Sequence, residues 1–356
     1  MSPREGGDEP NGENEPTDRG GGDGNGDSDT ARESAPLPTG DDLEAIQSAL
    51  IEWYEDDHRE YPWRQTDDPY AILVSEVMSQ QTQLDRVVDA WEAFLERWPT
   101  TAALADADRA DVVGFWSSHS LGYNNRAKYL HEAARQIETE FDGTFPETPE
   151  ALQSLMGVGP YTANAVASFA FNNGDAVVDT NVKRVCFRAF SVPDDDDQFA
   201  TAANHLLPED RSRVWNNAVM ELGAVACGKQ PRCEATGCPW RQWCRAYATG
   251  DFSAPDVPTQ STFEGSRRQF RGRVIRTLES YDELALDELG PRIRVDYTPD
   301  GDHGREWLEG LLEDLETDGL VELETRSRGI HADPEEDRGS SSDDANESER
   351  VVRLKR

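Results

Sequence analysis

The sequence predicts a mainly α-helical protein with a small winged-helix-like unit at its C-terminal end. From Asp41 to about Phe190, apolar residues recur with a helical period almost without interruption. No convincing set of strands precedes Asp251, whereas the residues after it alternate short helices with β-like segments.

The first part of the chain carries no helical signal. Residues 1–40 consist largely of Gly, Asp, Glu, Asn and Pro, so we expect a disordered acidic tail. The stretch "TGDDLEAIQSALIEWYEDD" (39–57) then predicts a helix with an Asp cap. A helical pattern continues through "PYAILVSEVMSQQTQLDRVVDAWEAFLERW" (69–98). Further helices are predicted at "NRAKYLHEAARQIETEF" (125–141) and "YTANAVASFAF" (161–171).

A linker rich in Pro, Ser and Gly is predicted over residues 251–263. The remainder, 264–356, has the order of a small winged helix whose wing is interrupted by an acidic insert at 331–349. Its segments are "RQFRGRVIRTLES", "DELALDELG", "RIRVDY", "REWLEGLLEDLETDG", "LVELE" and "RVVRLKR".

The chain is strongly acidic, with 71 Asp and Glu against 35 Lys and Arg and a net charge of −36. Taken alone, this argues against nucleic acid as a partner, because nucleic-acid binders usually carry a basic footprint. The acidity extends beyond the two acidic segments, however, and Lys is scarce, a pattern typical of proteins from salt-loving cells. The charge is therefore weak evidence about the partner.

Nothing in the sequence indicates a membrane protein. No apolar run approaches the roughly 18 residues that span a bilayer, and no signal segment opens the chain. We expect a soluble, cytoplasmic monomer.

The stretch "AILVSEVMSQQTQ" (71–83) places a carboxylate on an apolar helical face. At 100° per residue Glu76 falls between Ile72 and Leu73, with Gln80 one turn further along the same stripe. Burying an unpaired carboxylate is costly, so the pKa of Glu76 should be raised.

The segment "LMGVGPYTANAVASFAF" (155–171) has the form of a helix–hairpin–helix. Gly157 and Gly159 permit a tight turn whose N–H groups face outward at the start of the next helix, where they can hold a phosphate. The alternative is an ordinary turn between helices.

A second carboxylate follows in "AVVDTNVKRV" (176–185). Asp179 precedes a helix, so it could act in a site or simply as an N-cap. Lys183 and Arg184 could contact phosphates or form a solvated helix face.

Four of the five cysteines are crowded into one short loop. They are spaced C-x5-C-x4-C-x5-C, at Cys227, Cys233, Cys238 and Cys244. Structural zinc sites usually have two close Cys pairs, whereas nearly even spacing suits a [4Fe–4S] cluster, which we favour over zinc. Cys186 is expected to be an ordinary buried thiol.

Five motifs in order resemble one family. "SEVMSQQTQ", "LGYNNRAKYL", "GVGPYTANAVASFAF", "VVDTNVKRV" and the four-cysteine loop are similar to those of helix–hairpin–helix DNA glycosylases, most of all the MutY-type adenine glycosylases. The resemblance covers residues 41–250. It implies two helical lobes with DNA and an extrahelical base between them, and a cluster in the loop 227–244.

The resemblance also implies roles for individual residues. Glu76 would protonate the leaving purine and Asp179 would stabilise the sugar cation, with Tyr123 and Asn181 supporting the two acids. The residues implied to contact DNA include Gln81 as a wedge in the gap left by the flipped base. They are Gln80, Gln81, Gly157, Val158, Gly159, Tyr161, Thr162, Lys183 and Arg184.

The expected partner is double-stranded DNA with a mismatched or oxidised base pair, specifically adenine opposite 8-oxoguanine or guanine. Residues 251–356 do not resemble the Nudix-type domain with which MutY proteins recognise 8-oxoguanine, so the opposite base stays open. Two alternatives remain: a thymine or uracil mismatch glycosylase on the same scaffold, and a non-catalytic DNA-binding protein. The presence of both Glu76 and Asp179 argues against the latter.

Overall fold

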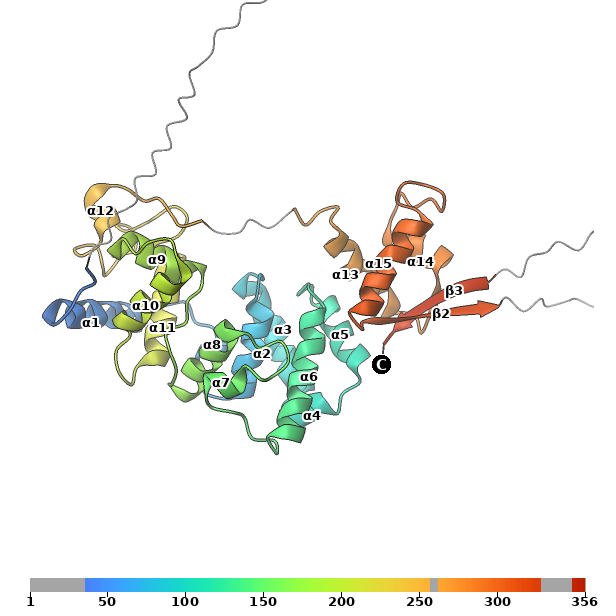
Figure 1. Cartoon of the computed structure of the whole chain (residues 1–356), viewed down its shortest axis with the longest axis horizontal. Coiled ribbons are helices and arrows are strands. Elements are labelled where there is room, and N and C mark those ends of the chain that lie inside the picture. The colour runs from blue at the N-terminus through green and yellow to red at the C-terminus, as the bar shows by residue number, and fades with distance from the viewer. Residues whose placement is uncertain (1–35, 257–261, 328–347, 356) are drawn as a thin grey trace, which may run out of the picture. The chain divides into compact units, whose positions relative to one another are not determined.

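The computed structural model describes residues 36–256, 262–327 and 348–355 (Figure 1). The rest of the predicted tail (1–35) and most of the predicted acidic insert (331–347) lie outside the described residues. In the described part of the chain, no helix combines the length and apolar character that crossing a bilayer requires.

The prediction of a mainly helical fold without strands before Asp251 is confirmed over the described residues. The apolar core before that point divides into two clusters, the counterpart of two lobes. The helices of the first cluster include α2 and α8, which pack against each other near the centre of Figure 1. They are α2 (Pro69–Ser79), α3 (Leu84–Arg97), α4 (Thr101–Ala105), α5 (Arg109–Ser118), α6 (Asn125–Glu140), α7 (Pro149–Leu152) and α8 (Pro160–Phe171), preceded by the short 3-10 turn η1 (Pro62–Arg64).

The second cluster joins the first predicted helix to the segment around the cysteine loop. Trp215 and Trp240 are fully buried in it, and the ring N–H of Trp240 donates to the carbonyl of Ile46 at 3.0 Å. Its helices are α1 (Asp41–Asp56), α9 (Thr180–Phe190), α10 (Asp196–Leu206), α11 (Ser212–Glu221), the π-helical turn η2 (Leu222–Ala226) and α12 (Arg245–Thr249).

Two local predictions were wrong. The N-cap of α1 is Gly40 and makes no side-chain cap bond; the acids Asp41 and Asp42 instead lie in the first turn, where they complement the helix dipole. The helix predicted to continue to Trp98 is interrupted after Ser79.

The interruption has a tertiary cause. The buried Arg126 of α6 donates to the carbonyl of Val77 at 3.0 Å and to that of Gln80, which satisfies the end of α2. Gln81 then adopts a left-handed conformation with φ 57°. The four residues Gln80–Gln83, here called the glutamine turn, therefore leave the helical stripe.

The C-terminal residues form the order expected for a winged helix: helix, strand, helix, helix, strand, strand. The elements are α13 (Arg267–Leu278), β1 (Leu284–Ala285), α14 (Leu286–Ile293), α15 (Arg305–Thr317), β2 (Val321–Ser327) and β3 (Ser348–Leu354). The antiparallel sheet has the order β1-β3-β2, in which Val352 pairs with both Leu284 and Leu323.

The C-terminal unit shares the first apolar cluster with the helices of the first lobe. Leu308, Leu311, Leu312 and Leu315, at helical spacing on α15, are fully buried. Helix α13 packs against α5, where the Ser117 hydroxyl donates to the carbonyl of Gly272 at 3.4 Å.

Candidate active site

The two predicted carboxylates line one pocket of about 260 Å³. Glu76 comes from α2 in the first lobe, and Asp179 stands at the start of α9 in the second. The walls therefore come from both lobes, and the family resemblance implies an extrahelical base between these lobes. Asn181, Tyr161 and Arg64 also line the pocket.

The pKa of Glu76 is raised, as the position of this residue on an apolar helical face predicts. This pKa is raised to about 7, chiefly because burial removes the carboxylate from water and also because the charge of Asp179 is near. A hydrogen bond from Tyr161 and the positive charge of Arg64 lower it. A carboxyl group in this range can hold or release a proton near neutrality.

Asp179 is an N-cap and a member of the site at once. One carboxylate oxygen accepts from the backbone N–H of Val182 at 2.7 Å, and the other accepts from Nδ2 of Asn181, also at 2.7 Å. Burial raises the pKa of Asp179, while these hydrogen bonds oppose the rise. The cap thus fixes the side chain in one orientation at the pocket wall.

Tyr123, which the family resemblance implies as a support of the two acids, does not line their pocket. It lines a separate pocket, where its ring lies 5.0 Å from the Arg126 guanidinium. The tyrosine beside the carboxylates is Tyr161, in the first turn of α8, for which the sequence predicts only a contact with DNA. No local sequence pattern links Tyr161 to Glu76, because the two residues are far apart along the chain. They come together because α8 packs against α2.

A buried ion cluster at the pocket wall was missed altogether. Glu221 is only 1% exposed, and its carboxylate accepts from Arg59 at 2.7 Å and from Arg64 at 3.0 Å. The paired arginines hold the pKa of Glu221 below its ordinary value despite burial. Glu221 follows Arg64 by more than 150 residues, so no local motif signals the pair.

A chain of hydrogen bonds runs from Asp179 to the cysteine loop. Beyond Asn181, the Arg184 guanidinium donates to Oδ1 of Asn181 at 2.7 Å and to the carbonyl of Cys227 at 2.7 Å. Arg184 is therefore directed into the protein rather than along a solvated helix face. Lys183 instead forms an ion pair with Asp196.

A glycine in η2 makes room for this chain. A Cβ at Gly223 would stand 2.6 Å from the Cβ of Asn181, closer than packed atoms approach. The carbonyl of Gly223 also accepts from Arg184 at 2.8 Å. The π-helical turn therefore lies directly against the support of Asp179.

The hairpin has the geometry expected of an anion site. Gly157 has φ 77°, and a side chain there would collide with Tyr129, whose Cβ lies 2.6 Å from the added carbon. Within the described residues, the backbone N–H groups of Gly157 and Gly159 make no hydrogen bond. Nearby, the Gln80 amide donates to the Thr162 hydroxyl at 3.4 Å, so the glutamine turn contacts the start of α8.

The four loop cysteines pack on the second apolar cluster as free thiols. Among the residues that the structure describes, no group of three or more His, Cys, Asp or Glu side chains could hold a metal ion as they stand. The buried Arg188 lies against the loop: it donates to the carbonyl of Gly228 at 2.8 Å and contacts Sγ of Cys227 at 3.6 Å. Cys186 is a buried free thiol, as predicted.

Comparison with known proteins places these features in a context. Residues 74–209 match the HhH-GPD superfamily of base excision DNA repair proteins. The chain is 38% identical to the adenine DNA glycosylase of Mycolicibacterium smegmatis, over 77% of this chain and 91% of that protein. It is 40% identical to the adenine DNA glycosylase of Mycobacterium tuberculosis, over 65% and 77% respectively.

Solved structures give the same picture of the fold. A thermostable thymine-DNA glycosylase superposes with a TM-score of 0.54 and 27% identity, covering 58% of this chain and 97% of that one. A trapped endonuclease III–DNA covalent intermediate superposes with a TM-score of 0.52 at 22% identity, covering 60% and 99%. The second likeness concerns the fold alone.

Proposed function

Because the chain belongs to the adenine DNA glycosylase family, it is a base excision repair enzyme that hydrolyses N-glycosidic bonds of adenine in DNA, and we propose that Glu76 and Asp179 perform this reaction. Adenine inside a duplex is unreachable, so it must be rotated out of the stack into the pocket between the lobes. One observation carries the proposal: a carboxyl group with a pKa of about 7 shares a pocket with a second, fixed carboxylate.

The two acids have different tasks because their surroundings differ. Glu76 gives its proton to the leaving adenine, so that the base departs as a neutral molecule. Positive charge then develops on the sugar, and the Asp179 carboxylate, oriented by Val182 and Asn181, stabilises it. Water adds at C1′ and leaves an abasic site. Tyr161 positions the Glu76 carboxyl.

DNA contact is assigned to the rim of this pocket. The free N–H groups of Gly157 and Gly159 face a phosphate, with Tyr161 and Thr162 at the start of α8. Val158 lies between the two glycines in the turn, and its own N–H donates to the carbonyl of Leu155 at 3.1 Å. Gln81 occupies the gap left by the flipped base, because its exposed side chain stands at the tip of the glutamine turn. Gln80 supports that turn through Thr162. Lys183 can contact the DNA backbone only if its ion pair with Asp196 breaks.

The cysteine loop suits a [4Fe–4S] cluster. Four free thiols lie within one loop, and the buried positive charge of Arg188 beside Cys227 favours a thiolate-bound, negatively charged group. The nearly even spacing of the four cysteines favours the cluster over zinc, whose structural sites usually have two close Cys pairs. Cys227, Cys233, Cys238 and Cys244 would hold it, and the cluster would supply a structural cross-link for the loop.

We further propose that the enzyme acts as a monomer on adenine opposite 8-oxoguanine or guanine. We also propose the domain boundaries that the sequence predicts: a glycosylase core at 41–250, a linker at 251–263 and a winged-helix-like unit at 264–356. A thymine or uracil specificity is less favoured, because the relatives at 38–40% identity are adenine glycosylases.

The test is incubation of the purified protein with duplexes that contain A:8-oxoguanine, A:G or T:G pairs, followed by alkali. Breaks at the adenine of the first two duplexes are expected, and the T:G duplex should stay intact. Release of thymine without release of adenine would overturn the proposal.

A further inference from the structure

Helix α13 is the most basic segment of this acidic chain, and its arginines point in different directions. Arg267 pairs with Asp314 at 2.8 Å and Arg271 pairs with Asp318, so acids of α15 and its end take up two of the charges. Arg273 donates inside the unit to the carbonyl of Ile293 at 2.9 Å. Acids of the same unit therefore pair with two of these arginines, and a backbone carbonyl accepts from a third.

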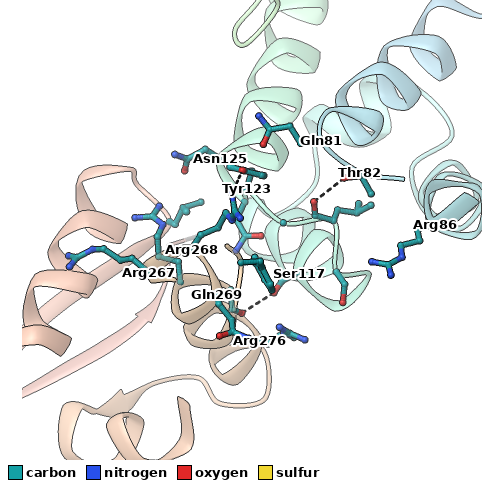
Figure 2. Close-up of a pocket in the computed structure, with 18 of the residues that line it drawn as sticks. Gln81, Thr82, Arg86, Ser117, Tyr123, Asn125, Arg267, Arg268, Gln269 and Arg276 are labelled. Atoms are coloured by element: carbon teal, nitrogen blue, oxygen red, sulfur yellow. Dashed lines mark hydrogen bonds between the residues drawn. The ribbon is translucent and has the colours of Figure 1, made fainter. Parts of the chain in front are cut away.

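The remaining arginines of α13 line a pocket of about 810 Å³ (Figure 2). This volume lies within the range typical of ligand sites. Helix α13 forms one wall, and the glutamine turn, α3 and the loop before α6 form the other. We call it the α13 pocket; the lining residues used below are Gln81, Thr82, Arg86, Tyr123, Arg268 and Arg276.

Arg268 is held on an aromatic ring at the centre of this pocket. It donates to the Tyr123 hydroxyl, and its guanidinium lies 5.1 Å from the Tyr123 ring and 5.3 Å from that of Phe263. Figure 2 shows Arg268 and Tyr123 directed toward each other from the two walls. A guanidinium fork beside aromatic rings matches the chemistry of a purine edge, because Arg binds the O6 and N7 acceptors of guanine in a bidentate manner.

Two further arginines of the α13 pocket supply positive charge, which in the case of Arg276 also acts on the carboxyl group of Glu279. Within the described residues, Arg86 and Arg276 form no hydrogen bond or ion pair through their side chains, and both are exposed. Such groups are available to the phosphates that flank a bound nucleotide.

The α13 pocket and the catalytic pocket share a wall. Thr82 lines both of them, so the glutamine turn separates the two cavities. If the flipped adenine occupies the catalytic pocket, the nucleotide that it leaves behind stays on the other side of this turn.

The rest of the winged-helix-like unit cannot take over this contact. Its third helix α15, the helix that winged helices usually lay into a groove, carries several acids and would repel phosphate. They are Glu306, Glu309, Glu313, Asp314 and Glu316. The unit therefore meets DNA through its first helix.

We propose that the α13 pocket binds the nucleotide opposite the excised adenine, and that Arg268 is a specificity-determining residue for a purine with an O6 acceptor at that position. The inference rests on the proposed function, since it concerns the substrate of the same reaction. It assigns to α13 of this chain the discrimination between opposite bases.

The test compares full-length wild type with Arg268→Ala in single-turnover excision and in duplex binding. Adenine is placed opposite 8-oxoguanine, guanine, cytosine or a tetrahydrofuran abasic analogue. Arg268→Ala should reduce excision opposite guanine by roughly ten- to a hundredfold, the scale of one bidentate base contact. Opposite 8-oxoguanine, whose N7 carries a hydrogen so that O6 is the acceptor left on that edge, excision should also fall, but by a smaller factor. Excision opposite the analogue, which has no base to read, should change less than twofold.

Matched variants separate base reading from packing or bulk charge. Arg292→Ala removes an exposed arginine of the same unit outside the pocket and should leave all four rates unchanged. Arg268→Lys retains the charge and the side-chain stem but lacks the fork, so discrimination should still fall. It also serves if the Ala variant does not fold. Arg276→Ala should weaken binding to all duplexes and lower the salt slope by about 0.9.

Equal losses on all four duplexes, or no loss on any, would overturn the inference. Its failure is distinct from failure of the proposed function. If wild type excises no adenine from any duplex the function is wrong, whereas the binding measurements still report on the α13 pocket.

Discussion

The Tyr161 hydroxyl is hydrogen-bonded to the Glu76 carboxylate and lowers the pKa of that group, whereas the charge of Asp179 raises it. Two neighbours therefore act on one acid in opposite directions, and burial, the largest cause, sets the pKa at about 7. With a pKa near neutrality, Glu76 can be protonated and can donate that proton at the pH at which a glycosylase works.

Glu76→Gln should abolish adenine excision and retain duplex binding, because the amide is nearly isosteric but has no proton to donate. The check is single-turnover excision together with binding by anisotropy. The raised pKa means that wild type loses stability as pH rises from about 4.5 to about 7, so the Gln variant should melt no lower than wild type above pH 7. Excision within a few-fold of wild type would refute the assigned role.

Tyr161→Phe should move the alkaline limb of the pH–rate profile to higher pH. A general acid works only while protonated, so wild-type excision falls as pH rises through about 7. Loss of the tyrosine hydrogen bond favours the protonated acid and raises the Glu76 pKa further. A full profile of single-turnover rates measures the shift. Tyr123→Phe changes a tyrosine outside the catalytic pocket and should leave the alkaline limb at its wild-type pH.

Asp179→Asn should lower the excision rate by roughly 10²-fold, the scale of one positioned electrostatic group. It should also move the alkaline limb to lower pH, because the charge that raises the Glu76 pKa is gone. The two shifts, upward for Tyr161→Phe and downward here, form a paired test. A variant that only melts earlier, with normal rates, would mean that Asp179 serves α9 as a cap and nothing more.

The enzyme should release the base without nicking the strand. Bifunctional relatives carry a Schiff-base lysine shortly after the hairpin glycines, and here that position is Tyr161, which cannot form an imine. Lys183 is engaged by Asp196 and should trap poorly with borohydride. Denaturing gels of the reaction, run with and without alkali, measure this: strand breaks are expected only after alkali treatment. Robust nicking by wild type that disappears in Lys183→Ala would contradict the prediction.

The purified protein should be brown and contain about four iron atoms per chain, as expected for one [4Fe–4S] cluster. Cys233→Ser should lower the iron content, whereas Cys186→Ser, at the buried thiol outside the loop, should retain it. Metal and sulfide analysis gives the answer directly. Stoichiometric zinc without iron would exclude the cluster.

Local patterns predicted two features that the structure has: a raised pKa for Glu76, the carboxylate in an apolar stripe, and an N-cap at Asp179. The catalytic roles of Asp179 and Asn181 came from the family resemblance and stay predictions. Sequence reasoning failed where partners come together across the fold: Tyr161 meets Glu76 only because α8 packs on α2, and Glu221 meets Arg64 from another lobe. The glutamine turn was hidden for the same reason, since a side chain of α6 ends the helix.

The close approach of Gly223 to Asn181 has a consequence for interpreting natural variation in this enzyme. Alanine is the better helix former, so a Gly-to-Ala change within a helical turn is ordinarily scored as harmless or even favourable. At this position the single added methyl would press on the residue that orients Asp179. The damage would be catalytic, although the altered residue has no functional group and touches no substrate. A ranking that scores substitutions by chemical similarity would therefore class Gly223→Ala as mild, although it would impair catalysis.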